Sequence, residues 1–155
     1  MAFTFAATDP TGNSATTATA SVTVSPTSAI ITGSNMTPGQ TATGTVNVSN
    51  TGTVDEFYQV TVNWSPSGTT TQGAATRLVN ELLVSVTAGS PLATSSPVFA
   101  GTMYALIDKP ASPGQALTLA TANENVQFQV IVPSTATASF EGIDVGFDIV
   151  FVALT

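Results

Sequence analysis

The chain contains no cysteine and no histidine among its 155 residues. Without cysteine, disulfides and thiol chemistry are excluded, and with them a disulfide-stapled secreted fold. Without histidine, the Ser-His-Asp triad, the Cys-His pair and the HExxH zinc motif are excluded. Phosphate-binding sequences of the forms GxxxxGK[ST] and GxGxxG are missing as well. Only carboxylates remain as candidate catalytic groups, so we expect that the protein is not an enzyme and holds no cofactor.

Charge is also scarce, because charged residues make up only 7% of the chain and nine acidic residues face two basic ones. The resulting net charge of −7 leaves no basic patch, so nucleic acid is not expected as a partner. Anionic membrane surfaces are disfavoured for the same reason. No apolar run is long enough to span a bilayer, and we expect no membrane insertion. Few charges remain to protect sheet edges from pairing with other chains.

The N-terminus lacks the positively charged start and the apolar core of a signal peptide. Either the protein is cytosolic, or a signal peptide has been removed and Met1 was added for expression. The absence of cysteine is compatible with both compartments.

Strict alternation of apolar and polar residues dominates the chain and predicts strands with one buried face. Weaker strands are expected at 28–32 and 82–87, and Pro-Gly or Gly-centred turns separate the strands. Many short strands with regular turn signals predict an all-β fold, an antiparallel jelly roll or β-sandwich. The clearest alternating stretches are ATASVTVSP (18–26), TATGTVNVSN (41–50), DEFYQVTVNWS (55–65), NVQFQVIVP (125–133) and GIDVGFDIVFVAL (142–154).

Two stretches depart from this alternation. SPSGTTTQGAAT (65–76) predicts a flexible polar loop. FAGTMYALIDK (99–109) has apolar residues at helical spacing and predicts one short helix between the sheets. The expected organisation is an N-terminal strand with its tether at 1–14, followed by one β-domain at 15–155.

Carboxylates are the remaining candidates for chemistry, and none forms a convincing site. Asp144 and Asp148 share one strand face, but about 13 Å would separate their Cα atoms. That distance is long for paired glycosidase carboxyls, so both are predicted to be solvated charges. A hard-cation site at Asp55 and Glu56 is conceivable, but the regular spacing of a calcium loop is missing. No metal site is predicted.

Three further residues have simple structural interpretations. Lys109 is the only lysine, and a surface position in a loop is favoured over an intramolecular isopeptide. Arg77 is predicted to cap a loop or to pair with Glu81 at i+4, which contributes little at an exposed site. Trp64 shares a strand face with Val60, which favours core packing over a sugar-binding platform.

The first residues, AFTFAA (2–7), predict a short apolar strand in which Phe3 and Phe5 would lie on one face. The polar stretch DPTGNSA (9–15) follows as a tether. Such a strand can complete the sheet of a neighbouring subunit. It can equally pair with its own sheet or fray, and the residues alone do not choose between these alternatives.

Taken in order, three segments resemble the TasA/camelysin family of secreted bacterial fibre proteins. MTPGQTATGTVNVSNTGTVDEFYQVTVNW (36–64) is similar to the family's Pro-Gly turn, strand, turn and strand. LVNELLVSVTAG (78–89) with VFAGTMYALI (98–107), and ANENVQFQVIVPSTATASFEGIDVGFDIVFVAL (122–154), resemble its later strands. The likeness covers roughly residues 20–154. Related archaeal bundling-pilus subunits share the fold logic and are the second family that the segments resemble.

The resemblance implies a jelly-roll domain that is secreted after removal of a signal peptide. It also implies that the subunits polymerise head to tail with copies of themselves into extracellular fibres of the biofilm matrix. Other matrix components are further candidate partners. Camelysin has been described as a protease, but this chain has no histidine with which to bind a catalytic zinc. Its very low lysine content also differs from the better-known members. The residues implied in the donor strand are Ala2, Phe3, Thr4, Phe5, Ala6 and Ala7.

Two other functions fit an all-β chain of this composition. A monomeric cell-surface binding or adhesin sandwich would need an exposed aromatic platform or a metal loop, and neither stands out. A jelly-roll shell protein also exchanges N-terminal arms between neighbours, but it builds closed assemblies.

Overall fold

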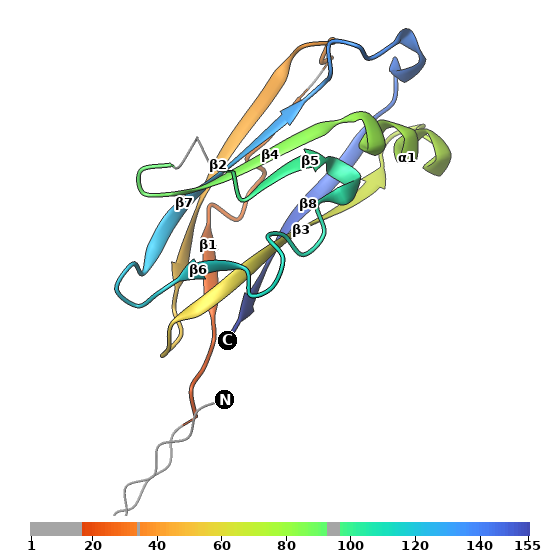
Figure 1. Cartoon of the computed structure of the whole chain (residues 1–155). Coiled ribbons are helices and arrows are strands. Elements are labelled where there is room, and N and C mark those ends of the chain that lie inside the picture. The colour runs from red at the N-terminus through yellow and green to blue at the C-terminus, as the bar shows by residue number, and fades with distance from the viewer. Residues whose placement is uncertain (1–16, 34, 93–96) are drawn as a thin grey trace, which may run out of the picture.

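The computed structural model describes residues 17–33, 35–92 and 97–155. Within these residues, eight strands form two antiparallel sheets that enclose one core, together with one α-helix and two short 3-10 helices (Figure 1). The predicted all-β fold of two antiparallel sheets is therefore confirmed, and the structure contains one short α-helix, although at a different position from the predicted one. The jelly-roll topology and the donor strand stay predictions.

The larger sheet has five strands and contains most of the alternating stretches. Its strand order is β1-β2-β7-β4-β5, with every neighbouring pair antiparallel. The strand expected at 82–87 is confirmed as β4, whereas the stretch 18–26 forms a strand only over its second half, as β1. The bounds are β1 (Val22–Ser25), β2 (Thr41–Asn50), β7 (Asn123–Ile131), β4 (Leu83–Gly89) and β5 (Phe99–Thr102).

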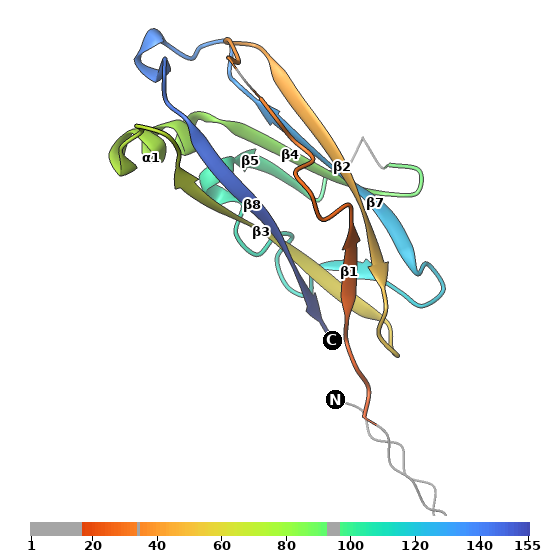
Figure 2. The same ribbon diagram turned by 180° about the vertical axis from the view of Figure 1, so that it is seen from behind.

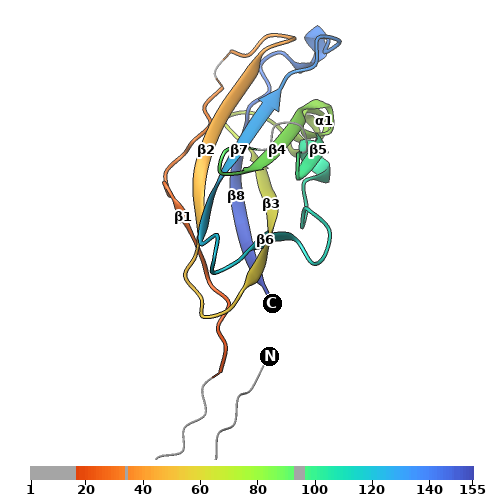
Figure 3. The same ribbon diagram turned by 60° about the vertical axis from the view of Figure 1, so that its left-hand side comes forward.

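The smaller sheet has three strands in the order β6-β3-β8 and covers the other side of the core (Figure 3). They are β6 (Gln115–Leu117), β3 (Glu56–Pro66) and β8 (Val145–Leu154). β3 and β8 are paired along the whole of β8, from Phe57 opposite Leu154 to Pro66 opposite Val145. β8 is an edge strand of this sheet.

The core is built from alternate residues of the central strands, as the period of two predicts. Each fully buried apolar side chain contributes roughly 1.5–3 kcal/mol to stability relative to the exposed state. Because a slip of one residue would turn this whole set toward solvent, burial fixes the register of the sheets. The buried residues of β2, β3 and β7 include Val46, Val48, Tyr58, Val60, Val62, Val126, Phe128 and Val130.

The α-helix lies where a polar loop is predicted, so the loop prediction for 65–76 is wrong in its second half. Helix α1 (Gln72–Glu81) begins after Thr71, whose hydroxyl accepts a backbone N–H of the first turn at 3.3 Å. Ala75 and Val79, four residues apart, are its two fully buried residues. One narrow apolar stripe therefore attaches the helix to the sandwich.

The short helix predicted at 99–109 is mostly replaced by a strand. β5 pairs with β4 over the first four residues, and only η1 (Met103–Ala105) is helical, as one 3-10 turn. Leu106 follows this turn and is fully buried. A second 3-10 turn, η2 (Ala138–Phe140), lies in the connection between β7 and β8.

A buried polar pair crosses the core between the two sheets. The hydroxyl of Tyr58 in β3 donates a hydrogen bond to Oε1 of Glu124 in β7 at 2.7 Å. Tyr58 is 0% exposed and Glu124 is 5% exposed. Burial, the hydrogen bond to Glu124 and the charge of that carboxylate together raise the pKa of Tyr58 far above its ordinary value of 10.0.

We expect the free energy of unfolding to fall as the pH rises above about 10. Tyr58 ionises in the unfolded chain near that pH but stays protonated when folded, so its stabilisation is complete below pH 10 and is lost as the pH rises toward the folded pKa. Urea unfolding measured from pH 8 to 11.5 should show that, above pH 10, the free energy of unfolding falls by up to about 1.4 kcal/mol per pH unit, and Tyr58→Phe should remove this fall. The matched control is Tyr104→Phe, because Tyr104 is 48% exposed. An equal loss of slope in both variants would contradict the assignment.

Candidate functional site

The predicted donor residues Ala2, Phe3, Thr4, Phe5, Ala6 and Ala7 lie outside the described residues, as does the whole predicted unit 1–14. Their role stays a prediction. The described part of the chain does contain an incomplete side of the sandwich, where the edge strands β1 and β8 lie side by side (Figure 2).

β1 and β8 differ greatly in length, and this difference leaves a gap between the sheets. β1 has four residues and pairs only with Asn47 to Asn50 of β2. After Ser25 the chain leaves the sheet, and the strand predicted at 28–32 does not form. Among the described residues, no strand therefore flanks the first half of β2 on the side that faces β8.

The inner face of β8 is covered less completely than that of its neighbour. Phe147, Ile149 and Phe151 are only half-buried, whereas the inward residues in the middle of β3 are fully buried. The reason is position, because within the described ranges β3 has a strand on both sides, whereas β8 has one only on the β3 side. Apolar surface and a row of backbone N–H and C=O groups therefore lie together at this edge.

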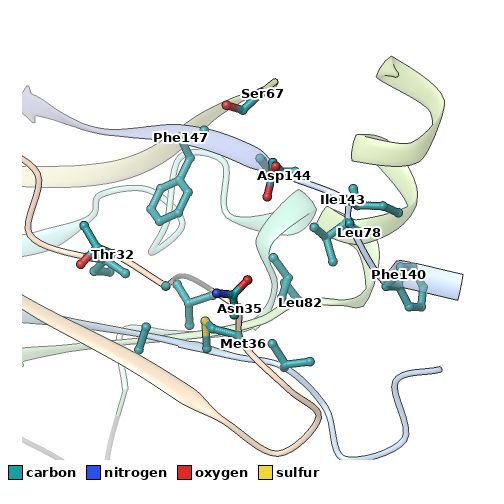
Figure 4. A pocket seen from close by; sticks show the side chains of 18 of the residues that line it. Thr32, Asn35, Met36, Ser67, Leu78, Leu82, Phe140, Ile143, Asp144 and Phe147 are labelled. Atoms are coloured by element: carbon teal, nitrogen blue, oxygen red, sulfur yellow. The ribbon is translucent and has the colours of Figure 1, made fainter. Parts of the chain in front are cut away.

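Two cavities follow β8 along this side of the sandwich, and we call them together the edge groove. The larger, of about 770 Å³, lies where β8 begins (Figure 4). The smaller, of about 270 Å³, lies between the middle of β8 and the chain that follows β1. Ile31 and Phe147 line both cavities, so the two cavities are adjacent. Further apolar side chains of the larger cavity include Met36, Leu78, Phe140 and Ile143.

One wall of the edge groove is the irregular segment 26–33, which we call the wall segment. It lies close against Gly44 of β2, which is buried. A Cβ atom at position 44 would clash with the carbonyl oxygen of Ile30 and would lie 2.7 Å from Cγ1 of Ile31. Glycine at this position therefore permits the close approach of the wall segment to the sheet.

The chain enters β1 through residues 19–21, which we call the arm root. The carbonyl of Thr19 accepts the N–H of Thr53 at 2.9 Å, and the N–H of Thr19 donates to the hydroxyl of Thr53 at 3.0 Å. The carbonyl of Ser21 accepts the N–H of Thr51 at 2.8 Å. These bonds fix the arm root to the loop between β2 and β3, at one end of the sandwich.

Glu56 completes the attachment of the arm root. Its Oε2 atom accepts the backbone N–H of Ser21 at 2.7 Å, and the residue is 1% exposed. Its Oε1 atom has no hydrogen-bond partner within the described part of the chain. Asp55, its neighbour in the conceivable cation site, instead accepts the N–H of Leu119 at 2.7 Å. No group of three or more His, Cys, Asp or Glu side chains that could hold a metal ion is found in the described ranges.

The other candidate residues are dispersed rather than brought together. Asp144 directly precedes β8 and Asp148 lies within it, and both are exposed. Arg77 is exposed and lies in α1 together with Glu81, so its predicted role as a loop cap or as the partner of Glu81 stays a prediction. Lys109 is half-buried, and its backbone pairs with Val60 of β3 in an isolated bridge.

Trp64 is half-buried and packs against the core, in agreement with the core-packing interpretation. Its ring centroid lies 6.4 Å from that of Tyr104 at the surface.

Sequence reasoning did not find the edge groove or the burial of Glu56, because both depend on contacts between distant segments.

A scan against protein-family models finds no match for this chain, and a search of curated proteins finds none either. Across residues 17–33, 35–92 and 97–155, no helix combines the length and the apolar character needed to cross a membrane. The edge groove combines adjacent apolar cavities with a strand edge that no other strand of the described residues covers, and this arrangement could accommodate an extended segment.

We expect Gly44→Ala to destabilise the protein by about 1–3 kcal/mol, because the added methyl group displaces the wall segment or β2. The matched control is Gly73→Ala in α1, where nothing lies within 4 Å of the added Cβ. That control should be neutral or stabilising by up to about 1 kcal/mol. Urea unfolding of both variants measures the difference. Equal effects would show that the wall segment is not held against Gly44.

Proposed function

We propose that this protein is a structural subunit of an extracellular fibre, in which the N-terminal strand of one subunit enters the edge groove of the next. The observation that carries this proposal is the half-buried apolar face of β8 beside an edge that no strand in the described part of the chain covers. An added strand would form main-chain hydrogen bonds with β8 and would cover Phe147, Ile149 and Phe151. Such strand addition completes the sandwich without any catalytic group.

The topology supports the jelly-roll part of the proposal. The connections from β2 to β3 and from β3 to β4 cross from one sheet to the other, and so does each connection from β5 to β8. Crossing connections of this kind are expected of a jelly roll. They agree with the resemblance to the TasA/camelysin family, which supports secretion and a place in the biofilm matrix.

The positions of the arm root and the edge groove favour a filament over a closed assembly. The arm root lies at one end of the sandwich, and the larger cavity lies at the opposite end, near α1 and η2 (Figure 1). A subunit stacked on the next in the same orientation therefore brings its arm root toward the neighbour's larger cavity. A head-to-tail contact of this type does not close on itself.

The length and composition of the N-terminal segment suit this contact. Burying Phe3 and Phe5 would contribute roughly 3–6 kcal/mol before the cost of ordering the segment. Residues 8–16, fully extended, reach up to about 30 Å, which sets the longest gap between adjacent subunits that this tether can span. Charged residues make up only 7% of the chain, which leaves few side chains that would oppose strand addition.

We expect the full chain to form long fibres in negative-stain micrographs and the chain lacking residues 2–8 to stay monomeric. The deletion removes the proposed donor strand and leaves every described residue in place. Normal fibres from the truncated chain would rule out donor-strand exchange. Closed shells from the full chain would favour the shell protein, and uniform monomers would favour the monomeric binding module.

A second test keeps the chain length constant. Phe3→Lys combined with Phe5→Lys would place two charges in the edge groove, which is costly without partners, and should abolish sedimentable fibres. Thr4→Lys combined with Ala6→Lys adds the same charge on the opposite face of the strand and should leave fibres intact. Loss of fibres in both double variants would attribute the effect to charge alone and not to the groove.

A further inference from the structure

We propose that the donor strand runs antiparallel to β8 of the acceptor subunit, with Phe5 in the larger cavity and Phe3 in the smaller one. This inference rests on the proposed function and adds the direction and register of the contact.

The direction follows from where the two ends of the contact lie. β1 and β8 run in opposite directions, so the arm root before β1 lies at the end of the sandwich where β8 finishes (Figure 2). In a head-to-tail stack, the tether of one subunit reaches the neighbour at the other end, where β8 begins. The tether follows the donor strand in sequence. The C-terminal end of the donor strand therefore lies beside the start of β8, and the two strands are antiparallel.

The register follows from the order of the cavities along β8. The larger cavity is lined by Val145, Gly146 and Phe147, and the smaller by Phe147, Asp148, Ile149 and Phe151. In an antiparallel pair, the residue nearer the tether lies nearer the start of β8, so Phe5 belongs to the larger cavity. Donor residues two apart are about 6.6 Å apart along the strand, which suits adjacent cavities that share Phe147 as a common wall.

The same register specifies which outward-facing residues are opposite each other. With Phe5 opposite Phe147 and Phe3 opposite Ile149, Ala6 lies opposite Gly146 and Ala2 lies opposite Val150. Gly146 and Val150 are exposed, and a Cβ at position 146 would have Ser65 Oγ as its nearest neighbour, at 4.0 Å. Both positions on β8 can therefore accept cysteine without disturbing the core.

The test uses engineered disulfides, because the chain has no cysteine of its own. Fibres of A2C/V150C and of A6C/G146C should give ladders of covalent oligomers on non-reducing gels after mild oxidation. The matched controls exchange the partners, as A2C/G146C and A6C/V150C. Their Cα atoms would be about 13 Å apart along the strand in the antiparallel register, which is beyond the reach of about 7 Å for a disulfide. These controls should stay monomeric on the gel.

Each outcome decides between specific alternatives. Ladders from the exchanged pairs alone would show a parallel donor strand and overturn the inference. Fibres that give no ladder with any of the four pairs would place the donor strand in another register or away from β8, and would overturn the inference as well. Cross-linked monomers without ladders would show that the arm fills its own groove, which contradicts the proposed function itself. Fibres formed after deletion of residues 2–8 would also contradict the proposed function. Ladders from the exchanged pairs would overturn only the antiparallel direction and would leave the proposed function unaffected.

Should a double variant not assemble, two single-cysteine variants can be assembled together with unmodified protein. The amount of covalent dimer then gives the same comparison between the pairs. A2C mixed with V150C should then form more dimer than A2C mixed with G146C. The reverse preference would overturn the antiparallel direction. Each single variant, oxidised without its partner variant, provides the background level of dimer.

Discussion

The pairing of β3 with β8 is the interaction on which the rest of the molecule depends. It holds β8 along one edge for its whole length and turns Phe147, Ile149 and Phe151 toward the core. The other edge of β8 pairs with no strand of the described residues and faces the edge groove. β8 thus covers the core with its inner face, and with its unpaired edge it borders the edge groove alongside the wall segment.

Strand positions could be predicted wherever neighbours on both sides impose a dry and a wet face, as for Val46 and Val48 in β2. The prediction failed at 28–32, where the adjacent residues Ile30 and Ile31 pack as a wall on Gly44 and do not alternate. The loop prediction failed at 72–76, where α1 begins, because a helix with two fully buried residues carries too weak an apolar stripe to stand out from its polar composition.

The two halves of the proposed contact differ in how far the sequence could predict them. The donor half rests on Phe3 and Phe5 in one short stretch and needs no knowledge of the fold. The acceptor half exists because the chain leaves the sheet after Ser25 while β8, more than a hundred residues later, continues alongside the gap. The burial of Glu56 likewise requires the arm root to lie across the start of β3, which no local pattern reveals.

The attachment of the arm root has a mechanical consequence. In a fibre of the proposed kind, tension would pass from the donor strand through residues 19–21 into β1 and into the loop held by Thr51, Thr53 and Glu56. The donor strand and β8 would both lie along the direction of pull, so their hydrogen bonds would be loaded in shear, all at once. A sideways force would open the same ladder one bond at a time. Such a fibre would be strong under stretching and would yield first where bending peels the strand from the mouth of the groove.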